Sequence, residues 1–219
     1  MDDFGKKLRQ SQVIGWKNKK DEVALFFKRF GLNVNDLYDQ IIMGGYEKMQ
    51  KVCYFLSKIR KVADICDFLD KKAVECRWDV DVMKIFFLIS HAEIAMQNFG
   101  KTGKKADLVK EFFGPVVEKY DLNNNIKLSL SEIISNREIN FGASEILYKI
   151  RCEYTHEGNY TGRIFKTTIE PNEEHVGNMI SFKINNSEIL CGECYLTYEQ
   201  FLVIYMEALI KNIENFIKK

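Results

Sequence analysis

Two side chains near residue 150 have the types and the spacing for acid–base chemistry on a phosphate group. Arg151 and His156 end a segment in which Ala143, Leu147, Ile150 and Tyr154 recur at helical spacing. Arginine presents a planar fork of donors to phosphate oxygens, and histidine exchanges a proton near neutral pH. The pattern predicts a phosphate-handling pair at the C-terminus of a helix.

The same stretch resembles the signature of a known family. Arg-x-x-x-x-His at the end of an amphipathic helix, in the context Tyr148 to Gly158, is similar to the motif of the HEPN superfamily. Members are small helical bundles, and many are metal-independent endoribonucleases of toxin–antitoxin and antiphage systems. The resemblance implies a mainly α fold of the HEPN helical-bundle type. It implies a bacterial toxin or defence nuclease with RNA as its substrate, without cofactor or metal, and with Arg151 and His156 as catalytic residues.

Cleavage without a metal uses the 2′-hydroxyl of the RNA itself. His156 would handle protons, which accelerates such reactions by roughly 10²–10⁴-fold. Arg151 would stabilise the charge that develops on the phosphate. The products that the resemblance implies are a 2′,3′-cyclic phosphate and a 5′-hydroxyl. Nearness in sequence alone makes four further residues candidates for RNA contacts: Lys149, Tyr154, Asn159 and Tyr160.

Helical geometry separates the two catalytic candidates. Residues five apart differ by about 140° in direction and about 7.5 Å in rise. Arg151 and His156 converge if the helix unwinds near Thr155, if Arg151 reaches around, or if two subunits meet. HEPN proteins usually use the last arrangement, so the resemblance implies a homodimer with a composite cleft. An antitoxin or regulatory protein is a further partner on the same ground.

A different hypothesis explains the same residues without catalysis. Arg151 would pair with Glu145 or Glu153, and His156 would cap the last carbonyls of the helix. The protein would then be a non-catalytic HEPN-like helical protein that binds a protein partner or a nucleotide.

The composition is that of a globular helical protein. The chain has 219 residues, of which 46% are apolar and only 2 are prolines, which favours long helices. A net charge of +1 excludes a strongly basic nucleic-acid coat but permits a local basic groove. Apolar runs such as Ile85 to Ile89 are too short for a membrane span, and the first residues do not resemble a signal peptide. We therefore expect a cytoplasmic protein without membrane contact.

The order of elements over the C-terminal two-thirds of the chain is compatible with the HEPN resemblance, which implies a division at about residue 75. Residues 1–75 are expected to form an N-terminal helical segment packed on or preceding the core, with residues 1–20 as a solvated polar terminus. Residues 76–219 are expected to form the HEPN-like domain. The helix over about 80–99 is apolar on nearly all sides, which predicts a central position, and His91 within it is expected as a hydrogen-bonded core residue.

The pattern changes to period two after the Arg151–His156 helix. It predicts a strand near 163–170 and an antiparallel β-hairpin over 178–194 that turns at Asn185–Asn186. Thr197 with Gln200 is a capping box for a last helix. The fold class expected is thus a helical bundle with a small β-hairpin insertion before the last helix.

Two motifs resemble metal sites. Asp121 to Glu132 has the ligand spacing of a calcium loop, but Ile126 stands where such a loop needs glycine. A turn followed by a capping box from Ser129 to Glu132 explains the same residues. Cys191 and Cys194 have no second ligand pair for zinc at suitable spacing, so a structural position near the hairpin end is expected.

Overall fold

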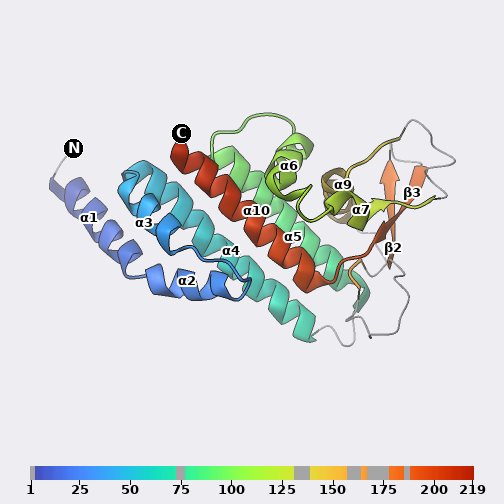
Figure 1. The fold of residues 1–219 in the computed structure, drawn as a ribbon, viewed down its shortest axis with the longest axis horizontal. Helices are drawn as coiled ribbons and strands as arrows, with labels where there is room; N and C mark the ends of the chain where they lie inside the picture. The colour runs from blue at the N-terminus through green and yellow to red at the C-terminus, as the bar shows by residue number, and fades with distance from the viewer. Residues whose placement is uncertain (1–2, 73–76, 131–138, 157–163, 167–177, 185–187) are drawn as a thin grey trace.

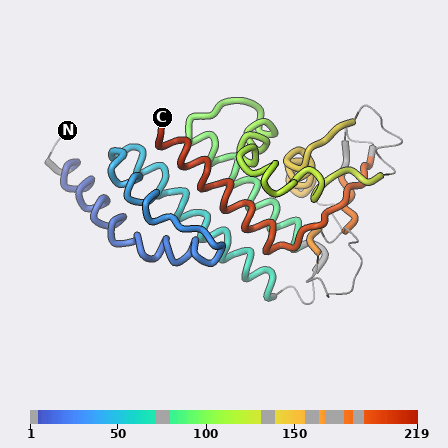
Figure 2. Tube along the Cα trace, viewed as in Figure 1, coloured from blue at the N-terminus to red at the C-terminus, as the bar shows by residue number. Residues whose placement is uncertain are grey.

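A computed structural model describes residues 3–72, 77–130, 139–156, 164–166, 178–184 and 188–219. It is mainly helical, with a small antiparallel sheet at one end of the molecule, as Figure 1 shows. The chain trace in Figure 2 places α1 at the end opposite to the sheet. The expected combination of helices with a β-hairpin before the last helix is confirmed.

The helices differ greatly in length. The long ones are α4, α5 and α10, and their neighbours are short segments that cover them. Their bounds are α1 Asp3–Lys17, α2 Lys20–Lys28, α3 Asn35–Met43, α4 Tyr46–Lys72, α5 Arg77–Asn98, α6 Lys105–Phe113, α7 Leu122–Asn125, α9 Ala143–His156 and α10 Tyr198–Lys218, with a 3₁₀ turn η1 at Gly114–Val116.

Most described residues before residue 20 are exposed, as expected of a solvated terminus, but residues 3–17 form the helix α1, which the sequence analysis did not predict. Val13 and Trp16 on this helix pack against the hydrophobic core. The Tyr38 hydroxyl also donates a hydrogen bond of 2.6 Å to the Trp16 carbonyl oxygen. These contacts, together with that of the Tyr46 hydroxyl with Gln12, attach α1 to the bundle.

The helix α5 is central, as predicted from its apolar residues on nearly all sides. It contacts α4, α6, α9 and α10. His91 in α5 is buried, and its Nδ1 lies 2.7 Å from the Tyr205 hydroxyl of α10. That hydroxyl donates to the Leu88 carbonyl oxygen at 2.9 Å. The prediction of a hydrogen-bonded core histidine is confirmed.

The hairpin is confirmed and belongs to a sheet of three strands. Strand β2 spans Asn178–Ile184 and β3 spans Glu188–Cys194. The turn predicted between these two strands lies outside the described residues. The sequence reading missed β1, Ile126–Leu128, which pairs antiparallel with β3 to give the order β1-β3-β2. Gly192 allows this pairing, because a Cβ there would lie 3.0 Å from the Lys127 carbonyl oxygen.

The last helix begins as predicted. The Thr197 side chain accepts a hydrogen bond from the Gln200 backbone, and the Gln200 side chain accepts one from the Thr197 backbone. Of the strand expected near 163–170, residues 164–166 are described, and Lys166 forms a parallel bridge with Thr197. The division of the chain at residue 75 stays a prediction, although buried residues from both sides of it form one cluster.

Candidate functional site

Helix α9 places Arg151 on the central helix of the bundle. Ala143, Ile146, Leu147 and Ile150 form its buried face. The N-terminus is fixed by Asn123, whose Oδ1 accepts a hydrogen bond of 2.9 Å from the Ala143 backbone. The buried face fixes the rotation of α9 about its axis, and the cap fixes its position along the axis. The direction in which Arg151 leaves the helix is therefore set by the core.

Arg151 forms an ion pair with Glu93 of α5. The Arg151 Nε lies 3.1 Å from Glu93 Oε1, and its Nη2 donates to Oε2 at 3.4 Å. The side chains are only 13% and 5% exposed, respectively. The 3.1 Å contact is electrostatic rather than an aligned hydrogen bond, since among the described residues neither atom has a hydrogen-bond partner. The hypothesis that Arg151 pairs with Glu145 or Glu153 does not describe this geometry, because the partner comes from another helix.

The environment of Glu93 disfavours its charge. Burial raises the pKa of this carboxyl group, while the positive charges of Arg151 and then Lys105 oppose the rise. A carboxylate whose charge is disfavoured by burial holds its guanidinium partner firmly, because losing the partner would leave an unpaired charge in the core. Glu93 therefore fixes the position of Arg151.

A tyrosine and a cysteine complete the surroundings of the pair. Burial raises the pKa of Tyr148 to about 12, and hydrogen bonding with Cys152 and the charges of Cys152 and Glu93 add to the effect. The Tyr148 hydroxyl is therefore protonated at neutral pH and remains a hydrogen-bond donor. Arg151 also lies 5.9 Å from the Phe86 ring centroid, which gives its guanidinium an aromatic wall.

The other predicted site residues have different surroundings. The Tyr154 ring packs on Phe86 with centroids 5.4 Å apart, so Tyr154 contributes to the wall beside Arg151. Lys149 instead has its Nζ 5.9 Å from the Phe141 ring, so the two cations contact different neighbours. Asn159 and Tyr160 lie outside the described residues.

His156 is the last residue of α9, and its side chain lies outside the described part of the structure. The helix is continuous through Thr155, so the unwinding that would bring the two residues together within one chain does not occur before His156. On this helix the directions of residues 151 and 156 differ by about 140°.

Glu93 and Phe86 are the site residues that sequence reasoning missed. In the sequence, Glu93 stands out only as a charge that interrupts an apolar helix. Such an interruption in a central helix signals a buried partner, because an unpaired buried carboxylate is costly. The partner itself lies 58 positions away, and no local pattern reveals it.

The two metal-like motifs have structural roles in the described chain. Asn124 Nδ2 donates to Asp121 Oδ1, and Asn125 Nδ2 donates to the Tyr120 carbonyl oxygen, so these amides stabilise a turn. The capping box expected at Ser129–Glu132 falls partly outside the described residues. Cys191 and Cys194 both lie on β3, three positions apart and hence on opposite faces. Within the described residues, no group of three His, Cys, Asp or Glu side chains could hold a metal ion.

Comparison of the chain with protein-family models, with curated proteins and with solved structures gives no match. Among the helices of the described segments, none combines the length and the apolar character that a membrane crossing requires.

Proposed function

We propose that this protein is a metal-independent endoribonuclease of a bacterial toxin or antiphage defence system. It cuts RNA by attack of the 2′-hydroxyl at a site shared by two copies of the chain. The observation that carries the proposal is the buried ion pair that fixes Arg151 on Glu93, in a helix that ends at His156.

The pair leaves Arg151 with donors to use on a phosphate. A guanidinium has five N–H groups, and Glu93 occupies only the side formed by Nε and Nη2. The remaining donors bind the oxygens of the scissile phosphate. His156 takes the proton from the 2′-oxygen, which then bonds to phosphorus. The bond from phosphorus to the 5′-oxygen breaks, and this oxygen receives a proton.

The geometry of α9 supports a composite site. Positions five apart on a continuous helix differ by about 140° in direction, which favours a site where one copy supplies Arg151 and the other supplies His156. Exposed apolar side chains that such a contact could cover are present on α5 and α4. Ile94, next to Glu93 on α5, is 48% exposed, and Phe68 on α4 is 59% exposed.

The test is cleavage of mixed-sequence RNA in EDTA by the wild type, Arg151→Lys and His156→Ala. Arg151→Lys keeps a positive charge against Glu93 but loses the planar fork, so the fold is retained. Lys110→Ala, on the exposed side of α6, is the control. We expect a 2′,3′-cyclic phosphate product from the wild type and the control only.

Mixing the two inactive variants distinguishes a shared site from a site within one chain. A dimer of one Arg151→Lys copy and one His156→Ala copy has one site with both natural residues if the site is shared. The mixture then regains activity. A mixture that stays inactive, with dimers shown by sedimentation, contradicts the shared site.

The second candidate function is that of a non-catalytic HEPN-like helical protein that binds a protein partner or a nucleotide. The low exposure of Arg151, 13%, favours it, because a paired and buried guanidinium serves stability as well as chemistry. A well-folded wild-type dimer that leaves RNA intact would support this second function.

A further inference from the structure

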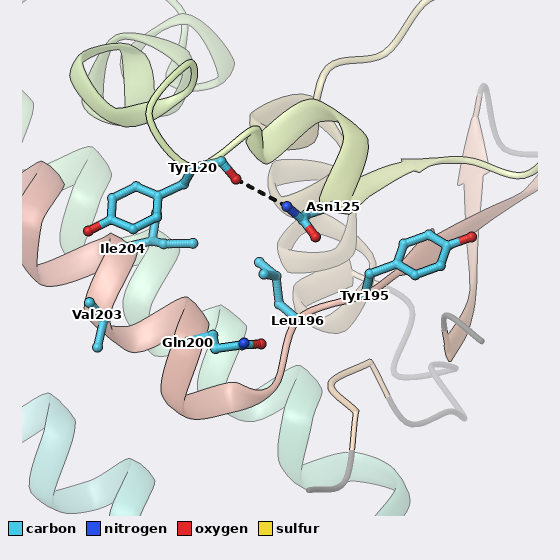
Figure 3. Close-up of a pocket in the computed structure, with 7 residues that line it drawn as sticks. All are labelled: Tyr120, Asn125, Tyr195, Leu196, Gln200, Val203 and Ile204. Atoms are coloured by element: carbon cyan, nitrogen blue, oxygen red, sulfur yellow. Dashed lines mark hydrogen bonds between the residues drawn. The ribbon is translucent and has the colours of Figure 1, made fainter. Parts of the chain in front are cut away.

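A pocket beside the first turns of α10 shares no residue with the Arg151–Glu93 pair. It has a volume of about 610 Å³ and is lined by residues of three segments: the turn before α7 with α7 itself, the β3–α10 junction and the first turns of α10. Figure 3 shows Tyr120 and Tyr195 at its two ends. We call it the Tyr120–Tyr195 pocket. Its volume suits one small ligand, since such sites commonly measure about 300–1,000 Å³.

The floor of the pocket is apolar and firmly held. Leu196 and Ile204 are 6% and 2% exposed, respectively, and Val203 is half-buried beside them. Tyr120 is anchored at one end through its hydroxyl, which donates to Glu207. A flat, weakly polar ring fits such a floor, because it covers the apolar side chains without burying unpaired polar groups.

Two amide side chains give the pocket one acceptor and one donor. Asn125 Nδ2 donates to the carbonyl oxygens of Tyr120 and Asp121, at 3.0 and 3.2 Å. Its Oδ1 must therefore face the other way, and Figure 3 shows it on the Leu196 side. The Gln200 Oε1 accepts from the Thr197 backbone at 2.9 Å, which leaves its Nε2 as a donor.

One acceptor and one donor are the types of group that the Watson–Crick edge of adenine needs as partners. That edge carries the N6 amino donor and the N1 acceptor, with a C–H group beside them. Uracil, guanine and cytosine each carry a further carbonyl or amino group on this edge. A third polar group would lie unpaired against the apolar floor, which costs binding energy.

Two lysines beside Tyr195 provide the place for a phosphate. The Nζ atoms of Lys127 and Lys166 lie 5.2 and 5.4 Å from the Tyr195 ring centroid. Glu193, opposite Lys127 in the sheet, accepts the hydrogen bond of the Tyr195 hydroxyl. These two ammonium groups and one carboxylate leave a net positive charge at this end of the pocket.

We propose that the Tyr120–Tyr195 pocket binds an unpaired adenine base, with its phosphate on Lys127 and Lys166. The base belongs either to an RNA strand or to a free adenine nucleotide. The proposal does not depend on cleavage by Arg151 and His156.

The experiment measures binding to a short 2′-O-methyl oligouridine with one central adenine, and to its twin with a central cytosine. These strands lack the attacking hydroxyl, so binding is measured whether or not the protein is a nuclease. We expect the adenine strand to bind about tenfold more tightly. Equal affinity for the two strands overturns the proposal.

Variants of pocket residues test whether the preference for adenine arises in the Tyr120–Tyr195 pocket. Val203→Trp fills the pocket and removes the preference for adenine, whereas Leu25→Trp, at a 68% exposed position of α2, keeps it. Gln200→Glu retains the acceptor for the Thr197 backbone but lacks the Nε2 donor, so the helix stays capped and the adenine-to-cytosine ratio falls. A preference that persists in both pocket variants overturns the proposal.

Charge variants and competition complete the test. Lys127→Gln with Lys166→Gln weakens both strands alike and reduces the salt dependence, while Lys110→Gln does not. Displacement of the strand by AMP at concentrations near the strand's own Kd identifies a free nucleotide as the ligand. Displacement only by a second strand identifies RNA.

Discussion

At the scale of single residues, the pair of Arg151 and Glu93 combines two roles. Glu93 holds the guanidinium where the proposed chemistry needs it, and Arg151 compensates a carboxylate that burial disfavours. A substitution of either residue therefore alters stability as well as the proposed activity. Loss of RNA cleavage in a variant of Arg151 or Glu93 therefore reports on catalysis only if the variant is shown to be folded.

The first prediction concerns Arg151→Ala. Without the guanidinium the pKa of Glu93 rises further, because the charge of Arg151 opposes the effect of burial. A carboxyl group whose folded pKa is above its unfolded value favours the fold at low pH and loses that contribution as pH rises. The loss in unfolding free energy is thus about 3 kcal/mol at about pH 8, where the buried Glu93 must ionise without Arg151, and smaller at about pH 5. Urea denaturation at both pH values measures it.

The control for this prediction is the double variant Arg151→Ala with Glu93→Gln. A neutral amide needs no cation, so the double variant recovers much of the lost stability and loses the pH dependence. A double variant less stable than Arg151→Ala alone would contradict the account.

At the scale of elements, Asp81 joins α5 to the segment that leads into the sheet. Its Oδ2 accepts hydrogen bonds from the Ile164 and Phe165 backbones, at 3.0 and 3.1 Å. Its Oδ1 faces Lys84, which is 2% exposed, at 3.4 Å. Lys84 also pairs with Asp70 and lies 4.1 Å from the Tyr198 ring centroid.

The second prediction is that Asp81→Asn destabilises the protein by about 2 kcal/mol, because hydrogen bonds to a charged acceptor are among the stronger ones. Asp70→Asn is the matched control. Asp70 pairs with the same lysine but is 53% exposed, so its loss costs less than 1 kcal/mol. Chemical denaturation of both variants measures the difference, and equal losses would contradict a role for the backbone contacts.

Local signals predicted whole elements, while pairings between distant segments stayed hidden. Thr197 and Gln200 mark the start of α10 in the sequence, because a capping box is formed by neighbours. Strand β1 has only three residues, too few for an alternating pattern, and its partner β3 is distant in sequence. Arg151 was found from its spacing to His156, whereas Glu93 was not, because their contact depends on the packing of α9 against α5.

At the scale of the whole molecule, His91 links the pH to the stability of the bundle. Its Nδ1 contacts the Tyr205 hydroxyl, which joins α5 to α10, and its ring packs on Phe55 of α4 at 5.6 Å. Burial lowers the pKa of His91 to about 4, against a smaller opposing effect of a backbone hydrogen bond with Phe55. The ring of His91 is therefore neutral in the folded protein at neutral pH.

The third prediction is a loss of stability in acid. A histidine whose folded pKa lies below its unfolded value of 6.5 stabilises the fold above that value, and the contribution falls as pH drops towards about 4. The difference in unfolding free energy between the wild type and His91→Gln therefore shrinks over this range. Denaturation curves at several pH values test it, and a constant difference would contradict the assignment.

The pairing of β1 with β3 has a consequence for synthesis in the cell. Ile126 is made before α9, but its partner Cys194 leaves the ribosome only after α9 and β2 have emerged. Contacts between distant segments must wait for the chain that joins them, and they form slowly. Helix α9 thus spends the last stage of translation in an incomplete fold. The sheet that packs against α9 is therefore complete only once β3 has been made.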